Sequence, residues 1–107
     1  MTQAQANQNN PVLLAAGAVN SAGVLLSNSG GIASVTRPNP DEYVIFLANA
    51  ADPLRTVPVV SVIGTTLATT LDVDMSNANG ATPSITVFAD DGTPAPAADF
   101  MVALLGF

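Results

Sequence analysis

Alternating and continuous apolar runs in the middle of the chain predict β-strands. Two runs, Val57–Ile63 and Leu67–Val73, are rich in Val, Ile and Thr, whose branched Cβ atoms suit a pleated sheet better than a helix. In the first run both alternating sets of side chains are largely apolar, so this strand needs cover on both faces, from a second sheet or another subunit. The second run alternates as a half-buried strand does. We expect the corner Gly64–Thr66 to join the two runs into a central hairpin.

Six further segments have the same strand-like composition, and turn-forming residues separate them. A loop is expected at Asn28–Gly31, between the segments Val24–Ser27 and Ile32–Arg37. The segment 99–107 is apolar on both faces and should be a central strand, because an exposed one would promote aggregation. About eight short strands in one domain, residues 12–107, predict an all-β fold, an antiparallel, jelly-roll-like β-sandwich or a barrel. The six segments are Val12–Val19, Val24–Ser27, Ile32–Arg37, Glu42–Ala48, Pro83–Ala89 and Asp99–Phe107.

A polar, uncharged stretch precedes the predicted domain. Residues 1–11 are rich in Gln and Asn, and Pro11 ends the stretch. A disordered tail is the default expectation for this composition. The alternative is an extended arm that orders against a neighbouring subunit or a capsid, with Gln3, Gln5, Asn7 and Asn9 as candidate anchoring residues. The stretch lacks the charged and apolar regions of a signal peptide.

The charge content of the chain limits its partners. Two Lys and Arg residues against eight Asp and Glu residues give a net charge of −6, which argues against nucleic acid or an anionic membrane as a partner. No segment reaches the roughly 18 apolar residues of a membrane helix. Charged residues make up 9% of the chain, whereas about a quarter is usual in soluble domains. We therefore expect much of the surface to be buried against other copies or other proteins.

Residues for catalysis are scarce. The chain contains no His, Cys or Lys, so a nucleophile would have no ordinary base. The carboxylate pairs Asp72/Asp74 and Asp90/Asp91 fit a solvated strand face and a turn, with a Ca²⁺ site as the weaker alternative. We predict that the protein is not an enzyme and holds no cofactor or metal.

The two arginines, Arg37 and Arg55, are the candidate polar sites. We expect structural ion pairs with Asp41, Glu42 or Asp99, within or between subunits. The alternative is recognition of an anionic sugar or a partner carboxylate, which the forked guanidinium would suit. Six apolar residues are candidates for the core or for a trimer interface, namely Tyr43, Ile45, Val60, Val62, Phe100 and Val102.

Three groups of short motifs resemble modules of bacteriophage fibre and head-decoration proteins. The chain opens with Gly17-Ala-Val, Gly23, Ile32-Ala-Ser-Val-Thr-Arg37 and Glu42-Tyr-Val-Ile-Phe-Leu47. A hairpin-like Val59-Val-Ser-Val62 follows. The chain closes with Ile85-Thr-Val-Phe-Ala-Asp-Asp-Gly92 and Ala98-Asp-Phe-Met-Val102. The resemblance covers about residues 15–107.

The resemblance implies a jelly-roll sandwich of the complement-C1q/tumour-necrosis-factor kind that forms trimers. It further implies a non-enzymatic structural protein of the virion, a capsid decoration or cement protein that binds the major capsid protein or another virion protein. Such a protein would be made in the host cytoplasm and would reside on the capsid surface. The alternative is a fibre or receptor-binding module that recognises a host-surface glycan or protein. The chain has no fibre shaft before the module, which favours the compact decoration protein.

Overall fold

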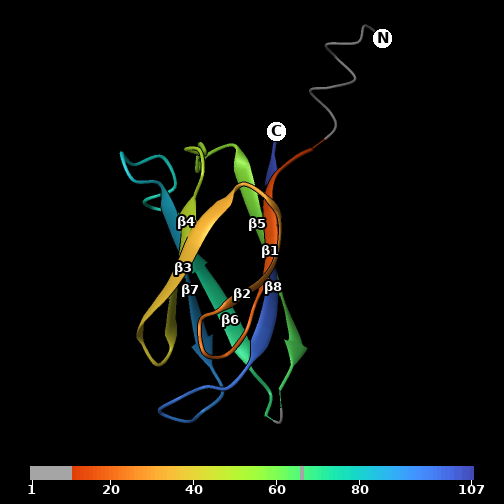
Figure 1. The fold of residues 1–107 in the computed structure, drawn as a ribbon, viewed down its shortest axis with the longest axis vertical. Coiled ribbons are helices and arrows are strands. Elements are labelled where there is room, and N and C mark those ends of the chain that lie inside the picture. The colour runs from red at the N-terminus through yellow and green to blue at the C-terminus, as the bar shows by residue number, and fades with distance from the viewer. Residues whose placement is uncertain (1–10, 66) are drawn as a thin grey trace, which may run out of the picture.

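A computed structural model describes residues 11–65 and 67–107, and these residues form an all-β fold without helices (Figure 1). The predicted all-β class is confirmed, and the number of strands is eight. No helix in the described part of the chain could cross a membrane. The strands are β1 (Val12–Val19), β2 (Leu25–Gly30), β3 (Ile32–Asn39), β4 (Glu42–Leu47), β5 (Thr56–Gly64), β6 (Thr70–Asp74), β7 (Ser84–Asp90) and β8 (Asp99–Gly106).

The strands form two four-stranded antiparallel sheets, in the orders β2-β1-β8-β5 and β3-β4-β7-β6. Each sheet has two edge strands, so the fold is a sandwich rather than a closed barrel. Strand β8 lies between β1 and β5, which confirms the prediction that this apolar segment is central. The pairing of the first strand with the last brings both ends of the described chain to the same end of the sandwich (Figure 1).

The expected central hairpin of β5 and β6 is wrong. β5 pairs along β8, and β6 pairs along β7 in the other sheet. The chain therefore passes from one sheet to the other between the end of β5 at Gly64 and the start of β6 at Thr70. Both strands are edge strands, so each has one neighbour. The neighbour of β5 is the last strand of the chain, β8, whereas the neighbour of β6 is the next strand in the sequence, β7.

Several strand boundaries also differ from the prediction, and the largest differences are in β6 and β2. β6 begins at Thr70 rather than Leu67. β2 extends through Asn28, Ser29 and Gly30, which were expected to form a loop. An edge strand needs backbone pairing on one side alone, so polar residues are tolerated there. The Asn28 side chain donates to the carbonyl oxygen of Ile32 at 2.8 Å, and Gly31 turns the chain at a φ of 85°.

The core lies between the two sheets, and aromatic residues form its centre. The rings of Tyr43 on β4 and Phe100 on β8 meet edge to face, with centroids 5.1 Å apart. Ile45 and Ile85 pack beside them on neighbouring strands of one sheet. Edge-to-face contacts of this kind add to the stability gained from burial alone.

Candidate functional site: the outer face of one sheet

The outer face of the sheet β2-β1-β8-β5 is apolar. The side chains of β8 alternate, so that Phe100, Val102 and Leu104 enter the core while the intervening residues face outward. Met101 is 51% exposed, and on the neighbouring strand Val59 is 47% exposed. Three rows of paired residues cross this face, Leu13–Leu105–Val57, Ala16–Ala103–Val59 and Ala18–Met101–Ser61.

This face is also almost free of charge. The four strands of the sheet contain one charged residue, Asp99 at the start of β8. Its Oδ1 atom accepts a hydrogen bond from the backbone nitrogen of Ser21 at 3.0 Å, which ties it to the β1–β2 turn. Four strands of this length present about 500 Å² as a flat face, from the usual strand spacing and rise per residue. An exposed apolar surface of that size marks an interaction site more often than a bare solvent face.

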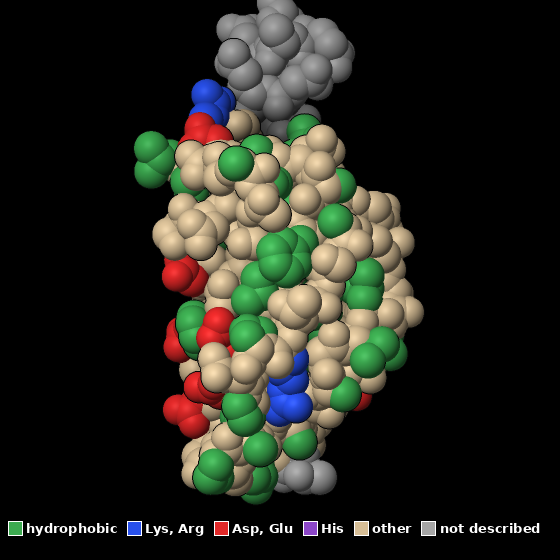
Figure 2. Space-filling view, turned by 60° about the vertical axis from the view of Figure 1, so that its left-hand side comes forward, with side chains coloured by type: hydrophobic (Ala, Val, Ile, Leu, Met, Phe, Trp, Pro, Cys, Tyr) green, Lys and Arg blue, Asp and Glu red, His purple; other side chains and the backbone are tan. Residues whose placement is uncertain are grey.

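The opposite outer face, on β3-β4-β7-β6, is acidic. Glu42 and Asp72 flank the exposed Phe88 in one row across β4, β7 and β6. Asp74 is paired with Thr86, and Asp90 with Thr70. Figure 2 shows most of the visible acidic side chains gathered along one side of the molecule. The sandwich therefore has one apolar face and one charged face.

The carboxylates considered for catalysis or calcium lie in turns and on the acidic face. The backbone nitrogen of Ser76 donates to Asp74, and this hydrogen bond lowers the pKa of Asp74. The hydroxyl of Thr93 donates a hydrogen bond to the carboxylate of Asp91, and this hydrogen bond lowers the pKa of Asp91. Within the described residues, no group of three or more acidic side chains is placed to hold a metal ion.

Arg37 and Asp99 both belong to a polar cluster around Tyr43. The guanidinium of Arg37 lies over the Tyr43 ring, 5.5 Å from its centroid. The Tyr43 hydroxyl donates to the carbonyl oxygen of Ser21 at 2.8 Å, and the nitrogen of Ser21 donates to Asp99. Burial raises the pKa of Tyr43, and the positive charge of Arg37 offsets part of that effect. This cluster holds the β1–β2 turn against the core.

The hydrogen bonds of both arginines to described residues go to main-chain oxygens. The expected ion pairs, within the chain or between subunits, stay a prediction. Arg37 donates to the Pro40 carbonyl oxygen through Nε at 3.1 Å and through Nη2 at 2.6 Å. Arg55 donates through Nε to the main-chain oxygen of Phe107, the last residue of the sequence, at 3.0 Å. The β3–β4 turn and the end of β8 bring these oxygens beside the two guanidinium groups.

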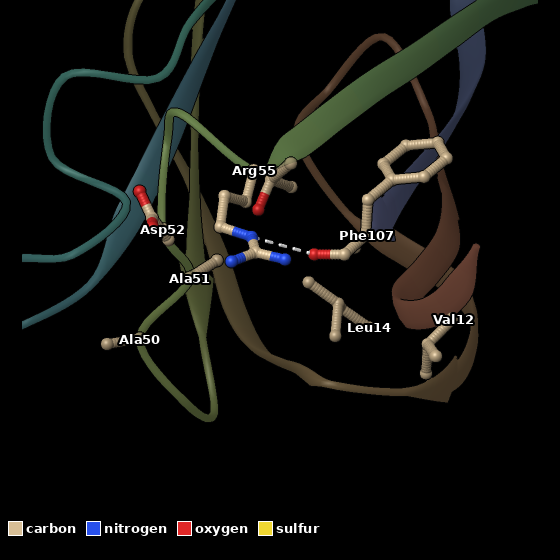
Figure 3. Close-up of a pocket in the computed structure, with 9 residues that line it drawn as sticks. Val12, Leu14, Ala50, Ala51, Asp52, Arg55 and Phe107 are labelled. Atoms are coloured by element: carbon tan, nitrogen blue, oxygen red, sulfur yellow. Dashed lines mark hydrogen bonds between the residues drawn. The ribbon is translucent and has the colours of Figure 1, made fainter. Parts of the chain in front are cut away.

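A hollow of about 400 Å³ lies beside Arg55 at the end of the sandwich where the described chain begins and ends (Figure 3). Its walls come from β1, from the loop before β5 and from the end of β8. Sequence analysis did not identify this hollow, because its residues lie far apart in the chain. It is lined by Val12, Leu14, Ala50, Ala51, Asp52, Arg55, Thr56, Gly106 and Phe107.

The six candidate residues for core or interface lie toward the inside of the sandwich. Tyr43, Ile45, Phe100 and Val102 are buried in the core. Val60 packs against that core and is partly buried, as is Val62. On the same strands, the side chains that face outward, between the buried ones, are the ones free to contact another molecule. The alternation in the sequence separates these two sets of side chains, but it does not show which set faces the core.

The candidate anchoring residues Gln3, Gln5, Asn7 and Asn9 lie outside the described residues. The described chain starts at Pro11, which is exposed next to β1. The anchoring role of the arm stays a prediction.

Comparison with known proteins gives no relative. No family model, no curated protein and no solved structure matches this chain. The function is therefore argued from the surface chemistry described above.

Proposed function

We propose that this protein is a non-enzymatic structural protein of a virion, which forms a homotrimer through the outer face of the sheet β2-β1-β8-β5. The observation that carries the proposal is the uncharged, apolar character of that face, opposite an acidic face on the same domain. The scarcity of charge in the whole chain then has a physical reason, because part of the surface is removed from water on assembly.

The free energy gained from this burial is comparable with the cost of association. The whole face measures about 500 Å² per subunit and includes exposed serines on β2 and β5, so removing its apolar part from water contributes at most on the order of 10 kcal/mol. The loss of translational and rotational freedom on association costs about 4–15 kcal/mol. Contact between several such faces can therefore give a stable oligomer, whereas the acidic outer faces would keep the assembly in solution.

The virion assignment rests on the resemblance to phage decoration and fibre modules. The residues that carry it lie in the core and on the central strands, among them Tyr43, Ile45 and Phe100. The partner would be the major capsid protein or another virion protein, and the protein would reside on the capsid surface and stabilise it. The N-terminal residues are the candidate anchor.

Two measurements test this proposal. Light scattering on the purified protein should give three times the 10.7 kDa mass of the chain, and the protein should co-sediment with head particles of the phage that encodes it. A soluble monomer would contradict the assembly argument. Binding to host cells without binding to heads would instead support the fibre or receptor-binding alternative.

A further inference from the structure

The outer face of the sheet β3-β4-β7-β6 has an aromatic and apolar centre. Phe88 on β7 is 40% exposed, and Val44 and Phe46 on β4 are half-buried on the same side of the sheet. Aromatic residues are enriched at the centres of protein–protein interfaces, where a polar rim surrounds them. The face therefore has the composition of an interaction surface, and its rim indicates the kind of partner.

Carboxylates flank the exposed ring of Phe88. Glu42 on β4 and Asp72 on β6 are both paired with Phe88 in one row across the sheet, and Asp90 follows two positions later on β7. Side chains paired directly in an antiparallel sheet have Cβ atoms about 4.5–5.5 Å apart. The carboxylate of Glu42 also accepts a hydrogen bond from Asn39 Nδ2 at 2.9 Å. A cation placed over the ring is therefore within reach of a carboxylate on either side.

The arginines of the chain leave these carboxylates available to an outside cation. The hydrogen bonds that Arg37 and Arg55 make to described residues go to main-chain oxygens. Asp74 adds a further negative charge in the next row, where it is paired with Thr86. The visible acidic side chains gather along one side of the molecule (Figure 2), and such a field attracts a cationic partner and repels an anionic one.

We propose that this face binds an arginine-bearing segment of a partner protein, with Phe88 as the central contact. One guanidinium lies over the Phe88 ring and pairs with Glu42 on one side and Asp72 on the other. Arginine suits this row better than lysine, because its planar group stacks on an aromatic ring and its N–H groups donate to carboxylates. Further cations of the same segment pair with Asp74 and Asp90.

This face is separate from the surface proposed for trimer formation. The two outer faces belong to different sheets and lie on opposite sides of the sandwich, so assembly through one leaves the other open. The inference rests on the charge and the aromatic centre of this face and not on the proposed function. Because the solution mass is measured separately, failure here leaves the trimer proposal standing, and a monomeric protein leaves this face testable.

The test is a titration of the folded protein with a blocked peptide in which three arginines alternate with serines, followed by nuclear magnetic resonance. We expect saturable amide shifts at Glu42, Asp72 and Phe88, an upfield shift of the arginine methylene signals from the Phe88 ring, and a dissociation constant of about millimolar order. The lysine counterpart should bind about threefold more weakly. The uncharged citrulline counterpart should cause no saturable shift. Equal binding of the arginine peptide and either counterpart, or no saturable binding, would overturn the proposal.

Three variants separate the site from the general attraction of an acidic protein for a basic peptide. Phe88→Leu keeps an apolar side chain and should weaken binding of the arginine peptide about threefold, while removing its preference over the lysine peptide. Asp72→Asn should weaken binding about threefold by removing one ion pair. Asp52→Asn is the matched control, because it removes the same charge from the loop before β5 and should leave binding unchanged. Equal losses in Asp72→Asn and Asp52→Asn contradict the proposal, even if Phe88→Leu does not fold.

Discussion

The substitution Met101→Asp tests the apolar face most directly. Met101 lies on the outer side of the central strand β8, in register with Ala18 on one neighbour and Ser61 on the other. Its side chain is 51% exposed and makes no part of the buried core. A charge at this position therefore acts mainly on whatever covers the face, and much less on the sandwich beneath it.

The expected effect can be estimated from burial. Full burial of a methionine contributes about 1.5–3 kcal/mol, so covering the exposed half contributes about 1 kcal/mol per subunit. A carboxylate forced into the same interface without a partner costs several kcal/mol more. Over three subunits, the assembly should lose on the order of 10 kcal/mol, which is enough to dissociate it at micromolar concentration.

Light scattering after size-exclusion chromatography measures the outcome. We expect the wild-type chain at three times 10.7 kDa and Met101→Asp at 10.7 kDa. Thr36→Asp is the matched control, because Thr36 is exposed on an edge strand of the other sheet and the added charge is the same. The interface assignment is refuted if Met101→Asp keeps the wild-type mass, or if both variants dissociate equally.

Three further predictions concern the stability of the fold and use chemical denaturation. Phe100→Ala should lower the free energy of unfolding by about 3–5 kcal/mol, because it opens a cavity at the fully buried centre of the core. Tyr43→Phe should cost about 1 kcal/mol through loss of the hydrogen bond to Ser21. The pKa of Tyr43 in the folded protein is raised above its ordinary value of 10.0, so the stabilising contribution of the Tyr43 hydroxyl is complete below pH 10 and is lost as the pH rises further. Tyr43→Phe should remove this loss of stability at alkaline pH. An equal alkaline decline in the wild type and in Tyr43→Phe would contradict the prediction. Gly31→Ala should lower the free energy of unfolding by about 1–3 kcal/mol from the positive φ of Gly31 alone, and by more because the new Cβ atom would clash with the backbone of β1. Gly64→Ala is the control, because a Cβ atom at Gly64 meets open space and should leave the free energy of unfolding nearly unchanged.

The fold class was predictable because each strand carries its own local signal. Branched residues, alternation and turn residues mark the segments around β4, β5, β7 and β8 without reference to any other part of the chain. The partners of the strands carry no such signal. The false hairpin of β5 and β6 shows this, since adjacent strands in sequence lie in different sheets here.

The hollow at Arg55 shows the same limit for a site. Arg55 was singled out because cations are rare in the chain, and a partner carboxylate was among the alternatives. Its surroundings could not be predicted, because Leu14 and Phe107 reach it through the pairing of β1 and β5 with β8. A residue's rarity is visible in sequence, whereas the walls of a hollow depend on tertiary structure.

The two-sided apolar strands explain both what the sequence predicted and what it missed. A strand such as β8 needs cover on both faces, and the opposite sheet covers the side of Phe100 and Val102. The outward side of β8 is only partly covered in a single chain, because Met101 stays 51% exposed there. The acidic face does not need to be covered by another molecule, because the charged side chains of Glu42, Asp72 and Asp74 are solvated there. The proposal that a second copy binds this face of β8 therefore rests on hydrophobic burial, and the mass of Met101→Asp tests it.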